Sequence, residues 1–99
     1  MSTPTLAASL SSFPTGSFLA TPGALTALAE AGVDPYELMS CHARKDWGDI
    51  DDEDRHENAL ALVCGWRLLS AYTLPTRERV WIITEADHSA TTILLPSEY

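Results

Sequence analysis

The sequence predicts an α+β fold in which N-terminal helices pack on a C-terminal three-stranded antiparallel β-meander. Two helix-start signals, Thr21-Pro22 and Asp34-Pro35, lie in the first half of the chain. After Gly65, apolar residues no longer recur every three or four positions but form β-branched and aromatic runs. A chain of 99 residues with 45% apolar side chains is long enough for one domain with one modest core.

Residues 1–16 are rich in Ser, Thr, Ala and Pro and show no apolar periodicity, so we expect a flexible N-terminal arm. Phe13 is the side chain of this arm that could still pack on the body. Residues 17–99 are predicted to form a single domain, and the first four of them favour a short edge strand.

The first two helices are bounded by their caps. The first is predicted from Pro22 to the residue before Gly32, because Pro suits the first helical position and Gly suits the position after the last. The second is predicted from Pro35 to about Arg44.

The third predicted helix starts near Asp51, with Asp49 or Asp51 as N-cap, and stops at Gly65. Its first turns are polar and its last turns are apolar. The chain has a net charge of −8, from 14 acidic and 6 basic residues. Residues 46–57 hold −6 of it, because Arg55 alone opposes seven acids: Asp46, Asp49, Asp51, Asp52, Glu53, Asp54 and Glu57.

Three strands are predicted at 67–74, 79–85 and 90–95, with turns at 75–78 and 86–89. Residues 80–83 are apolar on both faces, which predicts the central strand. Helices then cover one face of the sheet, and the other face carries four apolar side chains: Tyr72, Trp81, Ile83 and Leu94.

Three readings of the acidic segment remain open. It is a solvated helix start favoured by the helix dipole, a loose Mg²⁺ or Ca²⁺ site, or a surface that docks on a basic protein surface of the kind that holds nucleic acid. A calcium-binding EF-hand loop fails, because Asp54 stands where Gly is needed and Leu60 stands where Glu is needed.

Composition excludes several function classes. Six scattered Lys and Arg residues do not supply the clusters that direct nucleic-acid binding requires. No apolar run approaches the ~20 residues of a membrane span. The N-terminus lacks the basic and apolar regions of a secretory signal, so we expect a cytoplasmic protein. Cys41 and Cys64 are then expected to be free, mostly shielded thiols.

A catalytic reading is the alternative. His42 and Asp46 are four residues apart and can share one helix face, which is the minimum for general base catalysis. The sequence places no nucleophile beside them. A zinc set of Cys41, His42, His56 and Cys64 matches no known ligand spacing, so we predict no metal and no cofactor.

Three stretches carry a resemblance to known proteins: ATPGAL at 20–25, HARKDWGD at 42–49, and the ending 81–99. They resemble a family of small, uncharacterised bacterial proteins labelled plasmid-related and sometimes type I restriction subunits. The resemblance covers about residues 17–99 and implies a mobile-element setting, but it brings no established activity. A restriction methyltransferase subunit would need a cofactor-binding fold several times this length, with a Gly-rich loop that this chain lacks.

The chain departs from the family pattern at three positions: the family has Gly where Lys45 stands, Gly near Arg77, and Arg where His88 stands. The resemblance places the functional surface on matching motif residues: His42, Asp46, Trp47, Gly48, Asp54 and Asn58.

We therefore expect an acidic, non-enzymatic protein-binding module of a mobile element. One such module is an anti-defence inhibitor that imitates nucleic acid. Its partner is a protein with a basic surface, and a homodimer is a second way for so short a chain to build a site. The alternative is a small hydrolase or nuclease-like toxin using His42 and Asp46. The expected binding surface comprises Asp46, Trp47, Asp49, Asp51, Asp52, Glu53, Asp54, Glu57 and Asn58.

Overall fold

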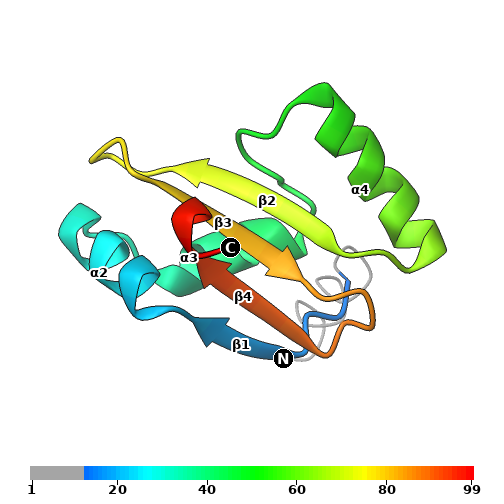
Figure 1. Ribbon diagram of the computed structural model, residues 1–99, viewed down its shortest axis with the longest axis horizontal. Coiled ribbons are helices and arrows are strands. Elements are labelled where there is room, and N and C mark those ends of the chain that lie inside the picture. The colour runs from blue at the N-terminus through cyan, green and yellow to red at the C-terminus, as the bar shows by residue number, and fades with distance from the viewer. Residues whose placement is uncertain (1–12) are drawn as a thin grey trace, which may run out of the picture.

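In the computed structural model, which describes residues 13–99, a four-stranded sheet carries helices α2 and α3 behind it and helix α4 beside its β2 edge (Figure 1). The α+β class is confirmed. The helices and strands are β1 (Ser17–Ala20), α2 (Pro22–Ala31), α3 (Pro35–Ala43), α4 (Asp52–Cys64), β2 (Leu68–Thr73), β3 (Arg79–Thr84), β4 (Ala90–Leu94) and the short 3-10 helix η1 (Pro96–Glu98).

The strand order is β1-β4-β3-β2. β3 pairs antiparallel with β2 and with β4, which confirms residues 80–83 as an interior strand. The predicted antiparallel meander is present as β2, β3 and β4, but the sheet is four-stranded and mixed, because β1 adds a strand that runs parallel to β4, with Ser17 opposite Ala90. Local patterns indicate strands but not their partners, and this pair joins the two ends of the domain.

The helix starts follow the predicted caps. The Thr21 hydroxyl accepts a hydrogen bond from the Ala24 N–H at 3.2 Å, and the Asp34 carboxylate accepts one from the Tyr36 N–H at 2.9 Å. Asp51, rather than Asp49, is the N-cap of α4.

Two groups of buried side chains hold the layers together. Between the sheet and helices α2 and α3 lie Leu28, Met39, Tyr72, Val80, Ile82 and Ile93. Tyr72 belongs to this helix-covered face because it pairs with Val80, so its predicted place beside Trp81 is wrong. The second group lies near α4 and comprises Phe13, Trp47, Ile50, Ala61, Leu68 and Ala71.

Phe13 is buried in this second group, with its ring centroid 5.3 Å from that of His42. Phe13 thus packs on the body, as the sequence allowed for this one side chain of the predicted arm. The carbonyls of Pro14 and Thr15, also in that arm, lie within hydrogen-bond distance of the His88 ring and the Thr91 hydroxyl. Residues 1–12 of the predicted arm lie outside the described residues. Among the helices of residues 13–99, none has both the length and the apolar character needed to cross a membrane.

Candidate functional site

The acidic residues predicted as a binding surface gather on the loop after α3 and on the first two turns of α4. We call this surface the acidic ridge: Asp46, Asp49, Asp51, Asp52, Glu53, Asp54 and Glu57. All seven are exposed except Asp54, which is half-buried. The ridge lies beside β2, at the edge of the sheet opposite β1 (Figure 1).

Backbone pairing fixes the ridge to the sheet. The Ala71 N–H donates to the Trp47 carbonyl at 3.1 Å, and the Asp49 N–H donates to the Ala71 carbonyl at 2.6 Å. The Thr73 N–H donates to the Asp49 carboxylate at 3.2 Å. Residues 69, 71 and 73 alternate along β2 and direct their backbone groups outward, so these contacts occupy groups that a bare edge strand would expose.

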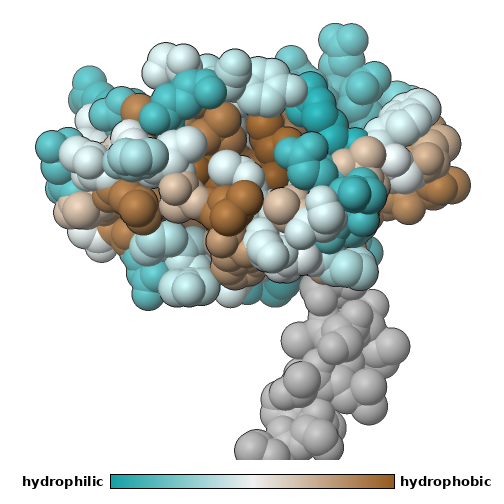
Figure 2. All heavy atoms as spheres, turned by 60° about the horizontal axis from the view of Figure 1, so that its bottom comes forward, coloured by the Kyte–Doolittle hydropathy of each residue, from teal (hydrophilic) through white to brown (hydrophobic). Residues whose placement is uncertain are grey.

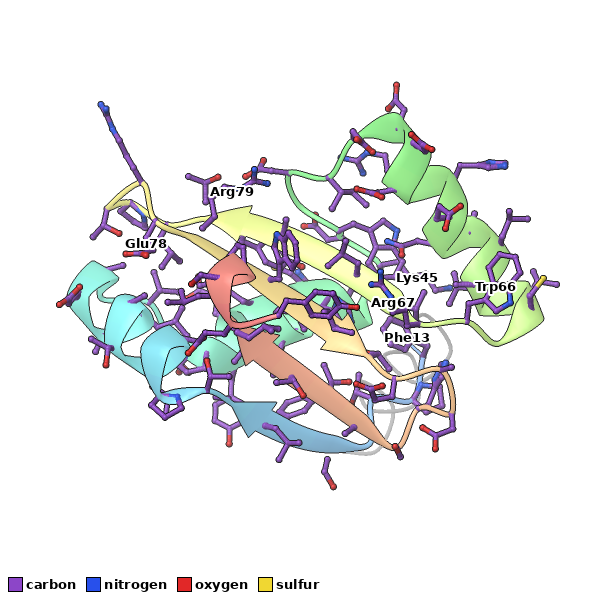
Figure 3. All side chains as sticks on the ribbon, in the orientation of Figure 1. Phe13, Lys45, Trp66, Arg67, Glu78 and Arg79 are labelled. Carbon is purple, nitrogen blue, oxygen red and sulfur yellow. The ribbon has the colours of Figure 1, made fainter. Side chains whose placement is uncertain are left out.

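Gly48 brings the loop this close. Its φ of 72° lies in the left-handed region, and a Cβ built there would lie 2.1 Å from the Ala71 carbonyl oxygen. The Arg55 guanidinium donates to the Gly48 carbonyl at 2.9 Å. The Arg79 guanidinium donates to the Asp49 carbonyl at 3.2 Å, and Figure 3 shows Arg79 beside this loop. Both arginines thus bind backbone oxygens at the ridge.

The carboxylates of the ridge repel one another. The pKa of Asp54 is raised, first by partial burial, then by the charge of Asp51 and its hydrogen bond, and then by the charge of Glu57. Arg67 opposes part of this rise. The ridge is therefore a concentrated negative field that a cationic partner would relieve.

A hollow of about 280 Å³ lies between the ridge and the sheet. Carboxylate-bearing residues from the loop and α4 line one side, and Trp81 of β3 lines the floor with apolar residues of β2. Carboxylates beside an indole ring can receive an ammonium or guanidinium group. The lining residues are Asp49, Ile50, Asp51, Asp54, Leu69, Ala71, Arg79 and Trp81.

His42 lies elsewhere, fully buried on the side of α3 that faces the sheet. Its Nδ1 atom is hydrogen-bonded to the Ser70 hydroxyl, and its Nε2 atom lies 2.8 Å from the Thr84 hydroxyl. The Thr84 hydroxyl also lies 2.7 Å from that of Thr91, which donates to the Thr15 carbonyl at 2.6 Å. This buried polar chain links α3, three strands and the segment before β1.

Burial lowers the pKa of His42 from 6.5 to about 4, so its imidazole is neutral at pH 7. Its ring nitrogens are occupied by hydroxyl groups rather than by Asp46. Asp46 is exposed, and its backbone carbonyl accepts a hydrogen bond from the Tyr72 hydroxyl at 2.6 Å. The structure therefore does not bring the two residues of the catalytic alternative together as an acid–base pair.

Two other predicted surface residues are buried. Trp47 packs against His42, with ring centroids 5.5 Å apart, and Asn58 binds the backbone of β2. Neither side chain is free to anchor a partner, and both instead support the ridge. The sequence did not identify Arg79 and Trp81 as site residues. For Trp81 a signal was present, because alternate residues of its strand form an apolar face that the helices do not cover.

Within residues 13–99, no group of three or more His, Cys, Asp or Glu side chains is arranged to hold a metal ion. Comparisons of the chain with protein-family models, curated proteins and solved structures give no match.

Proposed function

We propose that this chain is a non-enzymatic protein-binding module of a mobile element, and that its acidic ridge docks on a basic protein surface of the kind that holds nucleic acid. The observation that carries this proposal is the way the ridge is held. Its exposed carboxylates stand on a loop and a helix that are hydrogen-bonded to the edge of the sheet through Ala71 and Leu69. A preorganised charged surface loses little conformational entropy when it binds.

The spacing of the charges supports a nucleic-acid-like surface. Residues 51–57 carry five acids along a helix that rises about 1.5 Å per residue, or roughly 9 Å in all. That is close to the one charge per ~1.7 Å of duplex DNA. Arg55 interrupts the row, but its guanidinium binds the Gly48 carbonyl.

The hollow beside the ridge supplies specificity. A Lys or Arg side chain from a partner can enter it, pair with Asp51 or Asp54, and lie against the Trp81 ring. Long-range attraction would guide the partner to the ridge, and this contact would fix its register.

The experiment compares two variants with the same change in net charge. The ridge variant is Asp52→Lys/Glu53→Lys/Glu57→Lys, which leaves the Asp51 N-cap intact. The control is Glu30→Lys/Glu37→Lys/Glu85→Lys, three exposed acids away from the ridge. Each chain is immobilised and used to capture proteins from a bacterial lysate, with circular dichroism confirming the fold.

We expect wild type and control to retain the same partner, the ridge variant to lose it, and duplex DNA to displace it. Retention by the ridge variant would contradict the docking surface. A partner that duplex DNA does not displace would contradict the nucleic-acid-holding surface.

A further inference from the structure

The β1 edge of the sheet differs sharply from the β2 edge. In a parallel pair, backbone groups of alternate residues point to opposite sides of the strand. Ser17 and Thr21 donate to carbonyls of the β4 side, at 3.1 Å each, which directs the N–H and C=O groups of Phe18 and Ala20 outward. Among residues 13–99, the backbone groups of Phe18 and Ala20 form no hydrogen bond with a turn, loop or helix cap. Within the described part of the chain, the outer side of β1 is therefore an open edge.

The surroundings of this edge are apolar. Figure 2, which turns the β1 side toward the viewer, shows several hydrophobic patches on this surface. Phe18, Leu19, Leu25 and Tyr36 are 41%, 52%, 48% and 66% exposed. A groove of about 180 Å³ runs here, lined by Phe18, Leu25, Tyr36 and Met39 among others. Exposed apolar area beside an open strand edge is typical of an interface.

The strand itself is uncharged. Residues 13–29 contain no ionisable side chain. Glu98, near the C-terminal end of β1, is occupied by hydrogen bonds from the Thr21 hydroxyl and the Leu95 N–H. The acidic ridge lies at the opposite edge of the sheet. Two copies of a chain with net charge −8 can therefore approach through β1 while their ridges stay far apart.

We propose that β1 pairs antiparallel with β1 of a second copy, so that two four-stranded sheets join into one eight-stranded sheet. A two-fold axis at Leu19 makes the pairing self-complementary. Phe18 then exchanges both backbone hydrogen bonds with Ala20 of the partner subunit, and Ala20 does the same with Phe18 of the partner subunit. Leu19 faces Leu19 of the partner subunit on the open face, and the large Phe18 lies opposite a small Ala.

A second copy fits this edge better than a charged peptide. The residues of β1 offer no side-chain charge to select a basic or acidic sequence, and a basic peptide would be drawn to the ridge. In the two-fold pair, the two β1 strands present the same outward N–H and C=O groups, and the register centred on Leu19 places these groups opposite each other. This interface is independent of the proposed docking by the ridge, and it presents the two ridges at the far ends of one assembly.

Sedimentation equilibrium of the full chain across a concentration series tests the proposal. We expect the wild-type mass to rise with concentration from 10.8 kDa toward twice that value. Leu19→Lys should remain at the monomer mass, because it places two like charges opposite each other at the axis. Val63→Lys is the matched control, since Val63 is an 86% exposed apolar residue on α4, and it should dimerise as wild type does.

Ala20→Pro removes the outward N–H while leaving the inward hydrogen bonds of β1, and it should also remain monomeric. Amide hydrogen exchange gives a second measurement. The Phe18 and Ala20 amides should exchange more slowly as concentration rises, while the Leu19 amide, already bonded to β4, serves as the reference. A wild-type chain that stays monomeric at millimolar concentration would overturn the proposal. So would a dimer that persists in Leu19→Lys or leaves the Phe18 and Ala20 amides unprotected.

Discussion

The side-chain amide of Asn58 forms both of its hydrogen bonds with one backbone unit, that of Leu69. Its Nδ2 donates to the Leu69 carbonyl at 2.7 Å, and its Oδ1 accepts from the Leu69 N–H at 3.1 Å. Asn58 therefore acts in place of a paired strand residue and joins the middle of α4 to β2. The buried amide explains why a polar residue occupies the inner face of this helix.

Asn58→Ala should lower the free energy of unfolding by about 1–3 kcal/mol, because it leaves two partly buried backbone groups of Leu69 without partners. Urea denaturation followed by tryptophan fluorescence measures this. The exposed neighbour Glu57 provides the control, since Glu57→Ala should change stability by less than about 0.5 kcal/mol. Equal effects of the two substitutions would contradict the role of Asn58.

Stability should depend on pH through His42. Its folded pKa of about 4 lies below the ordinary 6.5, so between these values the unfolded chain binds a proton that the folded chain does not. The contribution of the neutral His42 to the free energy of unfolding is complete above pH 6.5, and it is lost as the pH falls toward 4. It amounts to about 3 kcal/mol at most. Urea denaturation at several pH values measures this. The free energy of unfolding should depend less steeply on pH in His42→Gln than in wild type. If the free energy of unfolding of His42→Gln depends on pH as steeply as that of wild type, the pH dependence arises from carboxylates and not from His42.

The turn after α3 contains a strained residue. Lys45 has a φ of 68°, in the region that disfavours side chains with a Cβ atom. Lys45→Gly should therefore raise the free energy of unfolding by about 0.5–1 kcal/mol. Its neighbour Arg44, with a φ of −86°, provides the contrast, because Arg44→Gly should be destabilising by a similar amount. Thermal unfolding of both variants measures this, and a loss of stability in Lys45→Gly would refute the strain.

The two thiols should react at different rates. Cys41 is half-buried and Cys64 is exposed at the end of α4, so the expectation that both are mostly shielded is wrong for Cys64. The apolar residues at the end of α4 do not all pack on the body: Ala61 is buried, but Val63 is 86% exposed. Thiol titration of the native protein should give one fast and one slow phase, and Cys64→Ser should remove the fast phase. A fast phase that survives in this variant would contradict the assignment.

The helix bounds and the central strand were predictable because they depend on local chemistry. Thr21, Asp34 and Asp51 cap helices through hydrogen bonds that span two or three residues. The place of β1 was not predictable, because its parallel partner lies more than 70 residues away in the sequence. Single-sequence patterns carry no information about such a pair.

The charged residues of the candidate site could be predicted from the sequence, but the buried residues that hold them in place could not. The exposed carboxylates follow from composition, since acids at a helix start remain in water. Trp47, His42 and Asn58 share the motif region with the acids, yet burial separates their roles. Which polar residue turns inward depends on Ser70, Thr84 and the β2 edge, and these belong to distant segments.

The docking role of the acidic ridge is tested most directly by measuring the equilibrium binding of the captured partner at two ionic strengths. Wild type and the Glu30→Lys/Glu37→Lys/Glu85→Lys control should bind alike, and their affinity should fall as salt screens charges beyond the ~8 Å Debye length. Asp52→Lys/Glu53→Lys/Glu57→Lys should lose affinity by tenfold or more at low salt while remaining folded. Binding by this ridge variant with the wild-type affinity and salt dependence would contradict the account.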